Sequence, residues 1–334
     1  MVHYASLMHP RTIEVRRYST GCRKTSPIVQ TSTLKSTASP GLAAPSPRQL
    51  LGIALICLAV LCFALLDSMS KLLAAHYAVT SVVWVRYGVH TLLMLVLFGP
   101  GTGLGLVRTA RPWTQILRGL LLLACTVLMI TGLRYIPLAE ATSILYLSPL
   151  LVTLLSIPLL NERVSRRNWV VAGLGFIGVL IIVRPGGALL TPAIALPLAA
   201  AVCNSFYQIV TRRLGGTESP IAMNFITGLV GTTVMSFALL FTWVTPTLTH
   251  ALLMLVMGAA GMGGHLLLTK AFQHATPAML APFSYGQIAW AVLLGYLIFD
   301  ALPDLGSVIG MAIIAGCGLY IAYHRTQGWA RRST

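Results

Sequence analysis

Residues 50–66 read LLGIALICLAVLCFALL, an apolar run without a charged residue, and residues 291–299 close another such run near the end of the chain. A helix needs about 18 or more apolar residues to cross the roughly 30 Å core of a bilayer. Hydrophobic residues make up 56% of the 334 residues and charged residues only 9%, whereas soluble domains carry about a quarter charged residues. The mean hydropathy is +0.82. The sequence therefore predicts a polytopic membrane protein and excludes an ordinary water-soluble enzyme.

The apolar segments predict ten membrane-spanning helices. They are continuously apolar rather than alternating, which favours helices over a transmembrane β-barrel, and turn residues such as Gly99-Pro100-Gly101 separate them. From residue 50 onward the chain has room for about ten spans of roughly 20 residues and for no soluble domain. The predicted spans are 50–74, 80–98, 113–133, 138–160, 165–183, 191–211, 220–243, 249–272, 277–299 and 303–323. The expected fold class is an all-α polytopic membrane protein.

Basic residues are distributed unevenly between the two sides of the predicted bundle. Cytoplasmic loops carry an excess of lysine and arginine, so the formal charge of +16 indicates topology rather than nucleic-acid binding. Lys71, Arg134 and Arg184 lie near the loops of one side, with the acids Asp300 and Asp304. The other side holds ten arginines: Arg108, Arg111, Arg163, Arg166, Arg167, Arg212, Arg213, Arg325, Arg331 and Arg332. We expect both termini in the cytoplasm, which requires an even number of spans.

A shift of 138 residues superimposes the first five predicted spans on the second five without a gap. Apolar sequences align readily, so the repeat depends on span order and loop positions; the shift pairs Asp67 with Ser205 and Arg86 with Asn224. Because each half has an odd number of spans, the halves must have opposite orientations. Inverted repeats of this kind form transporters that bind substrate between the halves, near the bilayer midplane. We expect five-helix repeats at residues 50–184 and 191–323.

Residues 1–47 and 324–334 lie outside the predicted repeats. The first segment is basic and rich in Ser, Thr and Pro, with Glu14 as its one acid, and it lacks the apolar core of a secretory signal. We expect a disordered cytoplasmic tail; an over-long gene prediction and an organelle transit peptide are the alternatives. The second segment is expected to be a basic cytoplasmic tail. No CxxC pair occurs among the six cysteines, so neither a disulfide framework nor a metal site is expected.

Four polar residues in the first two spans form the first candidate site. Asp67 and Lys71 are one helical turn apart, as are Arg86 and His90. Ionisable groups inside a bilayer are costly, so they are by default functional or paired. One interpretation is an Asp67–Arg86 ion pair, with Lys71 extending to the interface. The other is an outer gate, at which Lys71 or Arg86 meets an anionic group of the substrate.

Glu140 opens the fourth span just after Pro137. An acid in the first turn of a helix interacts favourably with the helix dipole, whereas a desolvated glutamate can bind and release a proton near neutral pH. We therefore consider both a capping residue and a carboxylate that couples transport to a proton or ion. Inside the predicted spans, the cations Lys71, Arg86 and Lys270 outnumber the acids Asp67 and Glu140. This excess of positive charge favours an acidic or zwitterionic solute over a cation.

Prolines interrupt the fourth and ninth spans at matching places of the two halves. Residues 146–149 read YLSP, and residues 282–287 read PFSYGQ. Proline removes a helical hydrogen bond and kinks a helix, and paired interruptions indicate a transporter's binding site; a packing kink is the alternative. The eighth span adds His265, which could contact substrate, carry a proton or form an interhelical hydrogen bond, and a glycine cluster at 258–264 that lets another helix approach. The predicted substrate-binding residues are Tyr146, Ser148, Ser284, Tyr285, Gln287 and His265.

Enzymatic motifs are missing from the sequence. It has no GxxxxGK[ST], HExxH or GxSxG pattern and no His/Cys cluster at metal-ligand spacing. We therefore expect no enzyme activity, no cofactor and no bound metal, and transport would be driven by a gradient. The motif Asn161-Glu162-Arg163 is expected to be a structural ion pair at the inner end of the fourth span.

Four stretches resemble the EamA family of the drug/metabolite transporter superfamily. They are DSMSKLL from Asp67, VVWVRYGVH from Val82, LAEATSILYLSPLLVTLLSIPLLNERV from Leu138 and ATPAMLAPFSYGQIAWAVLLGYLIFDALPD from Ala275. The resemblance covers about residues 50–323, and its motifs are specific for the family but not for a substrate. One departure is Asp300, where the family often carries Glu.

The resemblance implies ten helices in two inverted EamA units, alternating access, and a central cavity walled by the spans that hold Ser148, Tyr285 and His265. Members of the family export amino acids, related metabolites or opine-type metallophores, or import riboflavin or S-adenosylmethionine. We first expect a gradient-driven exporter of a small carboxylate-bearing or zwitterionic metabolite in the bacterial inner membrane. Its expected partners are this substrate, the lipid bilayer and a coupling proton or ion, with no nucleic acid; the oligomeric state is not predicted.

Two alternatives stay open. An importer of a vitamin or nucleoside-like compound could stack a flat ring on Tyr146, Tyr285 and Trp290. A channel or a non-transporting membrane assembly protein would belong to a different class.

Overall fold

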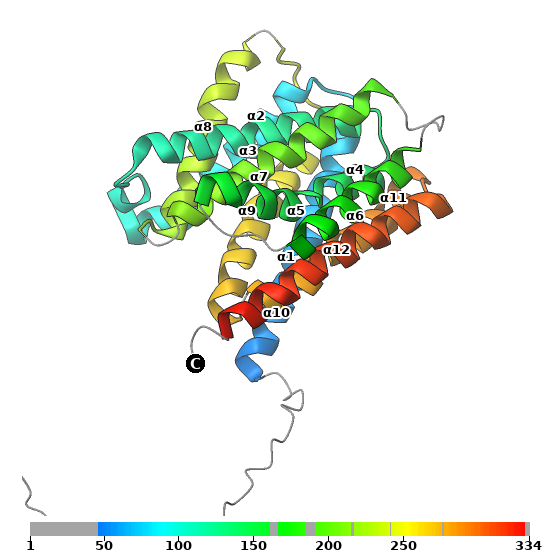
Figure 1. The fold of residues 1–334 in the computed structure, drawn as a ribbon. Helices are drawn as coiled ribbons and strands as arrows, with labels where there is room; N and C mark the ends of the chain where they lie inside the picture. The colour runs from blue at the N-terminus through cyan, green and yellow to red at the C-terminus, as the bar shows by residue number, and fades with distance from the viewer. Residues whose placement is uncertain are drawn as a thin grey trace, which may run out of the picture. The chain divides into compact units, whose positions relative to one another are not determined.

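The computed structural model describes residues 46–160, 166–184, 191–214, 217–240, 242–275 and 277–330, and these ranges contain helices and no β-strand (Figure 1). The predicted tail before residue 46, the Asn161-Glu162-Arg163 motif and the last four residues lie outside them. The helices are α1 Pro47–Ala74, α2 Val79–Thr102, α3 Pro112–Leu133, α4 Leu138–Leu145, α5 Ser148–Leu160, α6 Arg166–Val183, α7 Ala195–Leu214, α8 Pro220–Leu239, α9 Leu248–His274, α10 Pro277–Ser284, α11 Gly286–Phe299 and α12 Leu305–Ala330, with short 3-10 helices at Gly103–Leu106 and Pro192–Ile194.

These helices form an all-α polytopic membrane fold, as predicted. Eight segments in the described ranges are long and apolar enough to cross a bilayer, and two shorter apolar helices, Trp169–Val183 and Leu305–Ile321, bring the total to ten. The first span begins at Pro47 because Ser46 and Gln49 form a capping box, in which each side chain binds the other's backbone N–H. The last helix continues to Ala330, so the tail predicted from residue 324 is helical over most of its length.

Two crossings are each built from two helices rather than from one kinked helix. The breaks lie at residues 146–147, between α4 and α5, and at Tyr285, between α10 and α11; the shift of 138 residues relates them. Pro149 stands at the second position of α5, where its missing N–H costs little. The expected kink at Pro282 is displaced, because this residue lies inside α10. Only the bond from residue 282 to residue 278 is lost there, so the helix continues to Ser284.

The helix contacts recur when the two halves are exchanged. The shift maps α1–α6 onto α7–α12, and the packing of α1 on α9 has its counterpart in that of α7 on α3. The pairs α2–α8 and α6–α12 each join equivalent helices, and α6 and α12 lie side by side in Figure 1. This is the packing of a pseudo-twofold dimer of repeats. Since five crossings are expected in each half, we expect the repeats to enter the membrane from opposite faces.

Glycines of α9 let this helix approach α1 and α2 closely, as predicted. A Cβ atom on Gly258 would lie 2.5 Å from Cβ of Val89 on α2, and one on Gly261 would lie 2.7 Å from Cδ1 of Leu66 on α1. At Gly263, by contrast, a Cβ atom would meet nothing within 4 Å. The close approach brings the middle of α9, from the second half, against the middle of α2, from the first.

Candidate functional site

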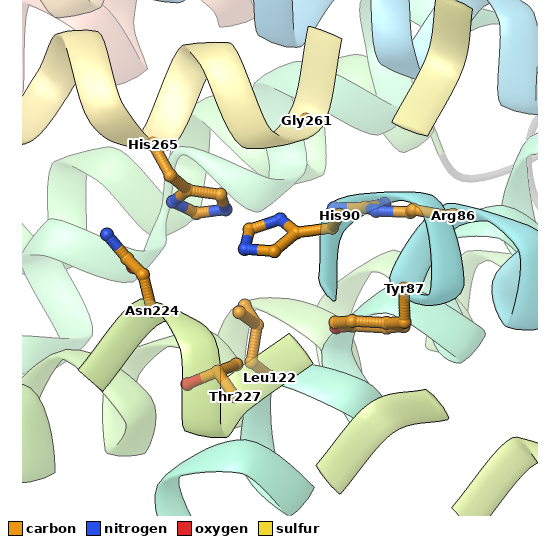
Figure 2. Close-up of a pocket in the computed structure, with 8 residues that line it drawn as sticks. All are labelled: Arg86, Tyr87, His90, Leu122, Asn224, Thr227, Gly261 and His265. Atoms are coloured by element: carbon orange, nitrogen blue, oxygen red, sulfur yellow. The ribbon is translucent and has the colours of Figure 1, made fainter. Parts of the chain in front are cut away.

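A small, largely enclosed cavity lies where the two halves meet, between α2 and α3 of the first half and α8 and α9 of the second (Figure 2). The volume of this cavity is about 10 Å³, which is room for about one water molecule. No acidic side chain of the described residues lines it. The lining residues are Arg86, Tyr87, His90, Leu122, Asn224, Thr227, Gly261 and His265.

His90 and His265 face each other across this cavity. Figure 2 shows the two imidazoles turned toward each other from α2 and α9, and their ring centroids are 6.0 Å apart. The ring of His265 also makes an edge contact with Phe63 of α1 at 5.0 Å. His90 is only 8% exposed, and its Nε2 has no hydrogen-bond partner in the described part of the chain. The sequence predicted these histidines for two different groups, and the structure brings them together.

Arg86 lies one helical turn before His90 and lines the same cavity. Its guanidinium carbon is 5.8 Å from the ring centroid of Tyr87. Within the described ranges its side chain forms no ion pair and no hydrogen bond, so the Asp67–Arg86 ion pair considered from the sequence is not formed. Asn224, the repeat partner of Arg86, contributes to the cavity from α8. A fixed positive charge thus stands at the meeting of the halves without an anion in contact.

A chain of hydrogen bonds joins both helix breaks to α1. The hydroxyl of Tyr146 donates to the carbonyl oxygen of Ser284 at 2.7 Å and lies 3.1 Å from Oε1 of Gln287. Nε2 of Gln287 in turn donates to Oδ2 of Asp67 at 3.1 Å. The rings of Tyr146 and Tyr285 are 5.0 Å apart. The structure therefore brings four of the six predicted substrate-binding residues together with Asp67 from the predicted gate.

Ser148 stabilises the first helix break and is not among the residues that line the central cavity. Its hydroxyl donates to the carbonyl oxygen of Leu145 at 2.5 Å, the group that Pro149 leaves without its usual helical donor. From α7, Nδ2 of Asn204 donates to the Ser148 hydroxyl, and the Ser205 hydroxyl donates to the Ser148 carbonyl, both at 3.2 Å. Ser148 thus ties the break in one half to the other half.

Lys71 lies apart from Arg86 and His90, at the end of the bundle where α1 and α3 terminate. Its Nζ donates to the carbonyl oxygens of Leu133 and Ile136 at 2.8 and 2.7 Å. Arg134 does the reverse and donates to the carbonyl oxygens of Ala74, the last residue of α1, and of Tyr77 in the following loop, both at 2.7 Å. Each cation binds the last carbonyl of the neighbouring helix and one in the loop after it. Both also line an open pocket of about 560 Å³.

Glu140 is also separate from the central cavity. It is 4% exposed in the first turn of α4, and its Oε2 has no hydrogen-bond partner in the described ranges. Ser307 of α12, which is 1% exposed, lies near enough for its side chain to interact with the Glu140 carboxylate. Lys71 and Asp304 are near enough for their charges to act on Glu140. The predicted coupling carboxylate thus lies toward the end of the bundle that holds Lys71.

Arg118 is a functional candidate that the sequence analysis missed. It lies inside the predicted third span, so the rule that flagged Arg86 would have found it. It is 2% exposed, and its guanidinium donates from α3 to two helices of the other half. The acceptors are the hydroxyls of Thr211 at 2.8 Å, Tyr207 at 2.9 Å and Thr227 at 2.6 Å, and the carbonyl oxygen of Met223 at 2.8 Å. Thr227 connects this network to the central cavity.

Comparison with known proteins places this architecture in a family. Residues 50–184 and 191–323 each match the EamA-like transporter family. An S-adenosylmethionine uptake transporter of Rickettsia bellii (strain RML369-C) is 30% identical over 80% of this chain and 91% of its own length. A riboflavin transporter of Rhizobium johnstonii is 27% identical over 86% and 96%, and the pseudopaline exporter CntI of Pseudomonas aeruginosa is 27% identical over 83% and 96%.

A polytopic helical bundle with two copies of this unit defines a membrane transporter of small molecules. The chain belongs to the EamA-like transporter family and is a multi-pass integral membrane protein. Its resemblance to drug/metabolite transporters, first indicated by four stretches of sequence, is confirmed.

Proposed function

We propose that the protein is a secondary transporter that takes up a nucleoside-like metabolite with an amino-acid group, such as S-adenosylmethionine, by alternating access. The observation that carries the proposal is Arg86, a partly buried cation that lines the central cavity and forms no ion pair within the described ranges. A guanidinium binds a carboxylate through two parallel hydrogen bonds. The α-carboxylate of an amino-acid-bearing substrate would supply the missing partner.

The polar residues at the helix breaks, which are linked to Arg86 by the charge of Asp67, fit the other groups of such a substrate. Asp67 is buried and has one oxygen bonded to Gln287, so its carboxylate can balance an ammonium or sulfonium charge. Tyr146 and Tyr285 present neighbouring aromatic rings at the helix breaks, which suit the face of a flat base. The presence of both signs of charge and of aromatic rings favours a solute that carries a carboxylate and a cationic group over a simple anion.

Uptake is the direction that the relatives support. The sequence led first to an exporter, but the relatives named for S-adenosylmethionine uptake and for riboflavin both cover at least four fifths of this chain. Import of a nucleoside-like compound, the alternative that the sequence left open, is therefore the leading proposal.

Export is the second candidate function. One relative is named as an exporter of pseudopaline, and an unpartnered Arg86 would suit any carboxylate-bearing metabolite. Accumulation of substrate inside cells that express the protein supports uptake, whereas faster loss from preloaded cells supports export.

We further propose the transport cycle and its setting. The central cavity has room for about one water, so the two repeats must move apart to admit a substrate on either side. Alternating access by inverted repeats provides such a movement. The proposal also includes repeat units at residues 50–184 and 191–323, cytoplasmic termini, a bacterial inner membrane and no catalytic reaction.

The test is uptake of radiolabelled S-adenosylmethionine by cells that lack their own carrier. Cells expressing the protein should accumulate label, and excess unlabelled substrate should compete. Arg86→Ala should lower uptake by about tenfold or more, the loss expected for roughly 1.4 kcal/mol of carboxylate binding, and Arg86→Lys should restore part of it.

Arg108→Ala provides the matched control, because Arg108 is exposed and outside the cavity. It removes the same charge and should leave uptake unchanged at equal expression. If the protein carries no S-adenosylmethionine, the proposed substrate is wrong. If it does, and Arg86→Ala transports normally, the proposed carboxylate site is wrong.

A further inference from the structure

The cavity between α2 and α9 has the features of a proton site. His90 and His265 come from different halves, and their rings meet at 6.0 Å. More than nine tenths of His90 is buried, and its Nε2 has no hydrogen-bond partner in the described ranges. His90 also lines the central cavity, which has room for about one water molecule. An imidazole nitrogen in this position can accept a proton directly or through one bridging water.

Other cations fit this cavity poorly. Sodium, magnesium and calcium ions prefer several oxygen ligands, commonly carboxylates, and no acidic side chain of the described residues lines the cavity. A zinc site needs three or more protein ligands, and no group of three or more His, Cys, Asp or Glu side chains in the described ranges could hold a metal ion. The positive charge of Arg86 also repels a metal ion. A proton shared by two imidazoles needs neither an anion nor a coordination shell.

The charged and titratable groups around the pair set the conditions under which it binds a proton. Arg86 acts on both histidines, and Arg118 of α3 acts on His265. Asp67 of α1 accepts a hydrogen bond from Gln287 and forms no ion pair with Arg86, but the two charges act on each other. The backbone of Asn224 faces His90. From α8 the cavity receives Asn224 and Thr227, which do not titrate. Tyr87 of α2 also lines the cavity. Cys125 of α3 and Tyr207 of α7 lie near Tyr87.

We propose that His90 and His265 bind the proton that is transported together with the substrate. Two positive charges in one buried cavity repel each other, so the fixed charge of Arg86 opposes proton binding in the empty transporter. A carboxylate bound at Arg86 neutralises that charge and thereby favours the proton. Because such coupling is reciprocal, the proton equally favours the carboxylate, and the protein moves both in the same direction. This inference rests on the proposed uptake function and names its coupling ion.

The first experiment measures protons during substrate binding. Purified full-length protein in weakly buffered detergent, with a pH-sensitive dye, receives S-adenosylmethionine at matched pH, while dialysis of radiolabelled substrate measures occupancy. We expect a net uptake of protons that rises with occupancy, and a loss of at least nine tenths of this uptake in the His90→Gln/His265→Gln variant. Protons released by the wild type, or equal proton uptake in the double variant, would overturn the proposal.

His76→Gln/His250→Gln is the matched control. These histidines also form a pair, with ring centroids 4.9 Å apart, but it lies at the ends of α1 and α9, where His76 is exposed. The control variant should take up as many protons per bound substrate as the wild type. A loss equal to that of the central pair would contradict the assignment of the proton to His90 and His265.

A second experiment needs no substrate, so it separates the proton site from the proposed function. In ¹⁵N-histidine NMR spectra at pH 6, Arg86→Gln should show a larger protonated fraction of His90 than the wild type, because the repelling charge is gone. Arg108→Gln should leave that fraction unchanged. Failure of S-adenosylmethionine to bind overturns the proposed substrate, whereas identical His90 signals in Arg86→Gln and the wild type overturn the coupling.

Discussion

Arg118 shows how this fold holds a buried cation without an acidic partner. Its guanidinium donates to three hydroxyls and one carbonyl oxygen of α7 and α8, so it joins the two halves. Arg118→Ala should remove four hydrogen bonds from a charged donor and lower stability by about 3 kcal/mol, since a hydrogen bond to a charged group contributes roughly 1.5–3 kcal/mol. A thermal melt of detergent-purified protein measures the loss. Arg108→Ala, which is exposed, should melt as the wild type does; equal melting of Arg118→Ala would contradict the structural role.

Gln287 is the central member of the chain from Tyr146 to Asp67. Gln287→Leu keeps most of the side-chain volume but leaves Oδ2 of Asp67 without its donor, so we expect uptake to fall about tenfold, the effect of roughly 1.4 kcal/mol. Tyr146→Phe should have a smaller effect, because the Gln287–Asp67 bond persists. The uptake assay at equal membrane expression measures both. A larger loss in Tyr146→Phe than in Gln287→Leu would place the important contact at the helix break instead.

Individual polar residues were predictable from the sequence, but their partners were not. His90 and His265 stood out because a polar residue in an apolar span needs an explanation. Their meeting depends on how α9 packs across the other half, and no local pattern encodes that distance. Lys71 looked like Arg86 in the sequence, yet it binds carbonyl oxygens at a helix end, because its position beside the end of α3 follows only from the tertiary fold.

At the scale of the element, the glycines of α9 set its distance from α2. Gly258→Ala should force Cβ against Val89 and destabilise the protein by about 1–3 kcal/mol, the usual cost of overpacking. Gly263→Ala is the control on the same helix, because nothing lies within 4 Å of its added methyl; it should be neutral or stabilise by up to about 1 kcal/mol through helix propensity. Thermal melts of the two variants give the comparison, and equal melting would mean that α9 can shift without cost.

The N-terminus of α12 depends on the charge of Asp304. The backbone N–H of Ser307 donates to Oδ1 of Asp304 at 2.7 Å, and a guanidinium nitrogen of Arg184 lies 3.1 Å from Oδ2 of Asp304. The hydrogen bond from Ser307 has the larger effect and the charge of Arg184 the smaller one, and both hold the pKa of Asp304 below its ordinary value. The pKa of Asp304 is lower in the folded protein than in the unfolded chain, where an aspartate has a pKa of about 4. The charge of Asp304 therefore stabilises the folded protein fully above about pH 4, and this stabilisation is lost as the pH falls through the pKa of the folded state.

Asp304→Asn and Asp304→Ala separate the cap from the ion pair. Asparagine still caps a helix, so the expected order of melting temperatures at pH 7 is wild type, then Asp304→Asn, then Asp304→Ala. The gap between wild type and Asp304→Asn should close as the pH is lowered below 4. A gap that stays constant with pH would show that the carboxylate charge does not contribute.

The elements themselves were largely predictable, because long apolar runs and turn residues fix where a helix can cross a bilayer. The breaks near Tyr146 and Tyr285 were approached but not located. Pro149 and Pro282 indicated them, yet Pro282 lies inside α10. A proline removes one hydrogen bond, and the position at which the helix finally ends depends on other donors, such as the Ser148 hydroxyl and the Tyr146 hydroxyl.

For the whole molecule, the pseudo-twofold packing makes a claim about topology. The loop after α2 holds Arg108, and the shift of 138 residues places the loop after α8 in the equivalent position of the second half, where Thr245 is exposed. If each half crosses the membrane five times, equivalent loops must open to opposite faces. In a cysteine-free background, Arg108→Cys should therefore react with a membrane-impermeant maleimide only from the cytoplasmic side, and Thr245→Cys only from outside.

Tyr135→Cys calibrates this measurement, because Tyr135 follows α3 at the opposite end from Arg108 and is 65% exposed. It should label from outside together with Thr245→Cys. Labelling of Arg108→Cys and Thr245→Cys from the same face would mean that the halves run parallel. The equivalence of the α1–α9 and α7–α3 contacts would then need another explanation. The proposal that substrate binds between inverted repeats would be wrong. Labelling from opposite faces, with Arg108 outside, would keep the inverted repeats and reverse only the orientation inferred from the arginines.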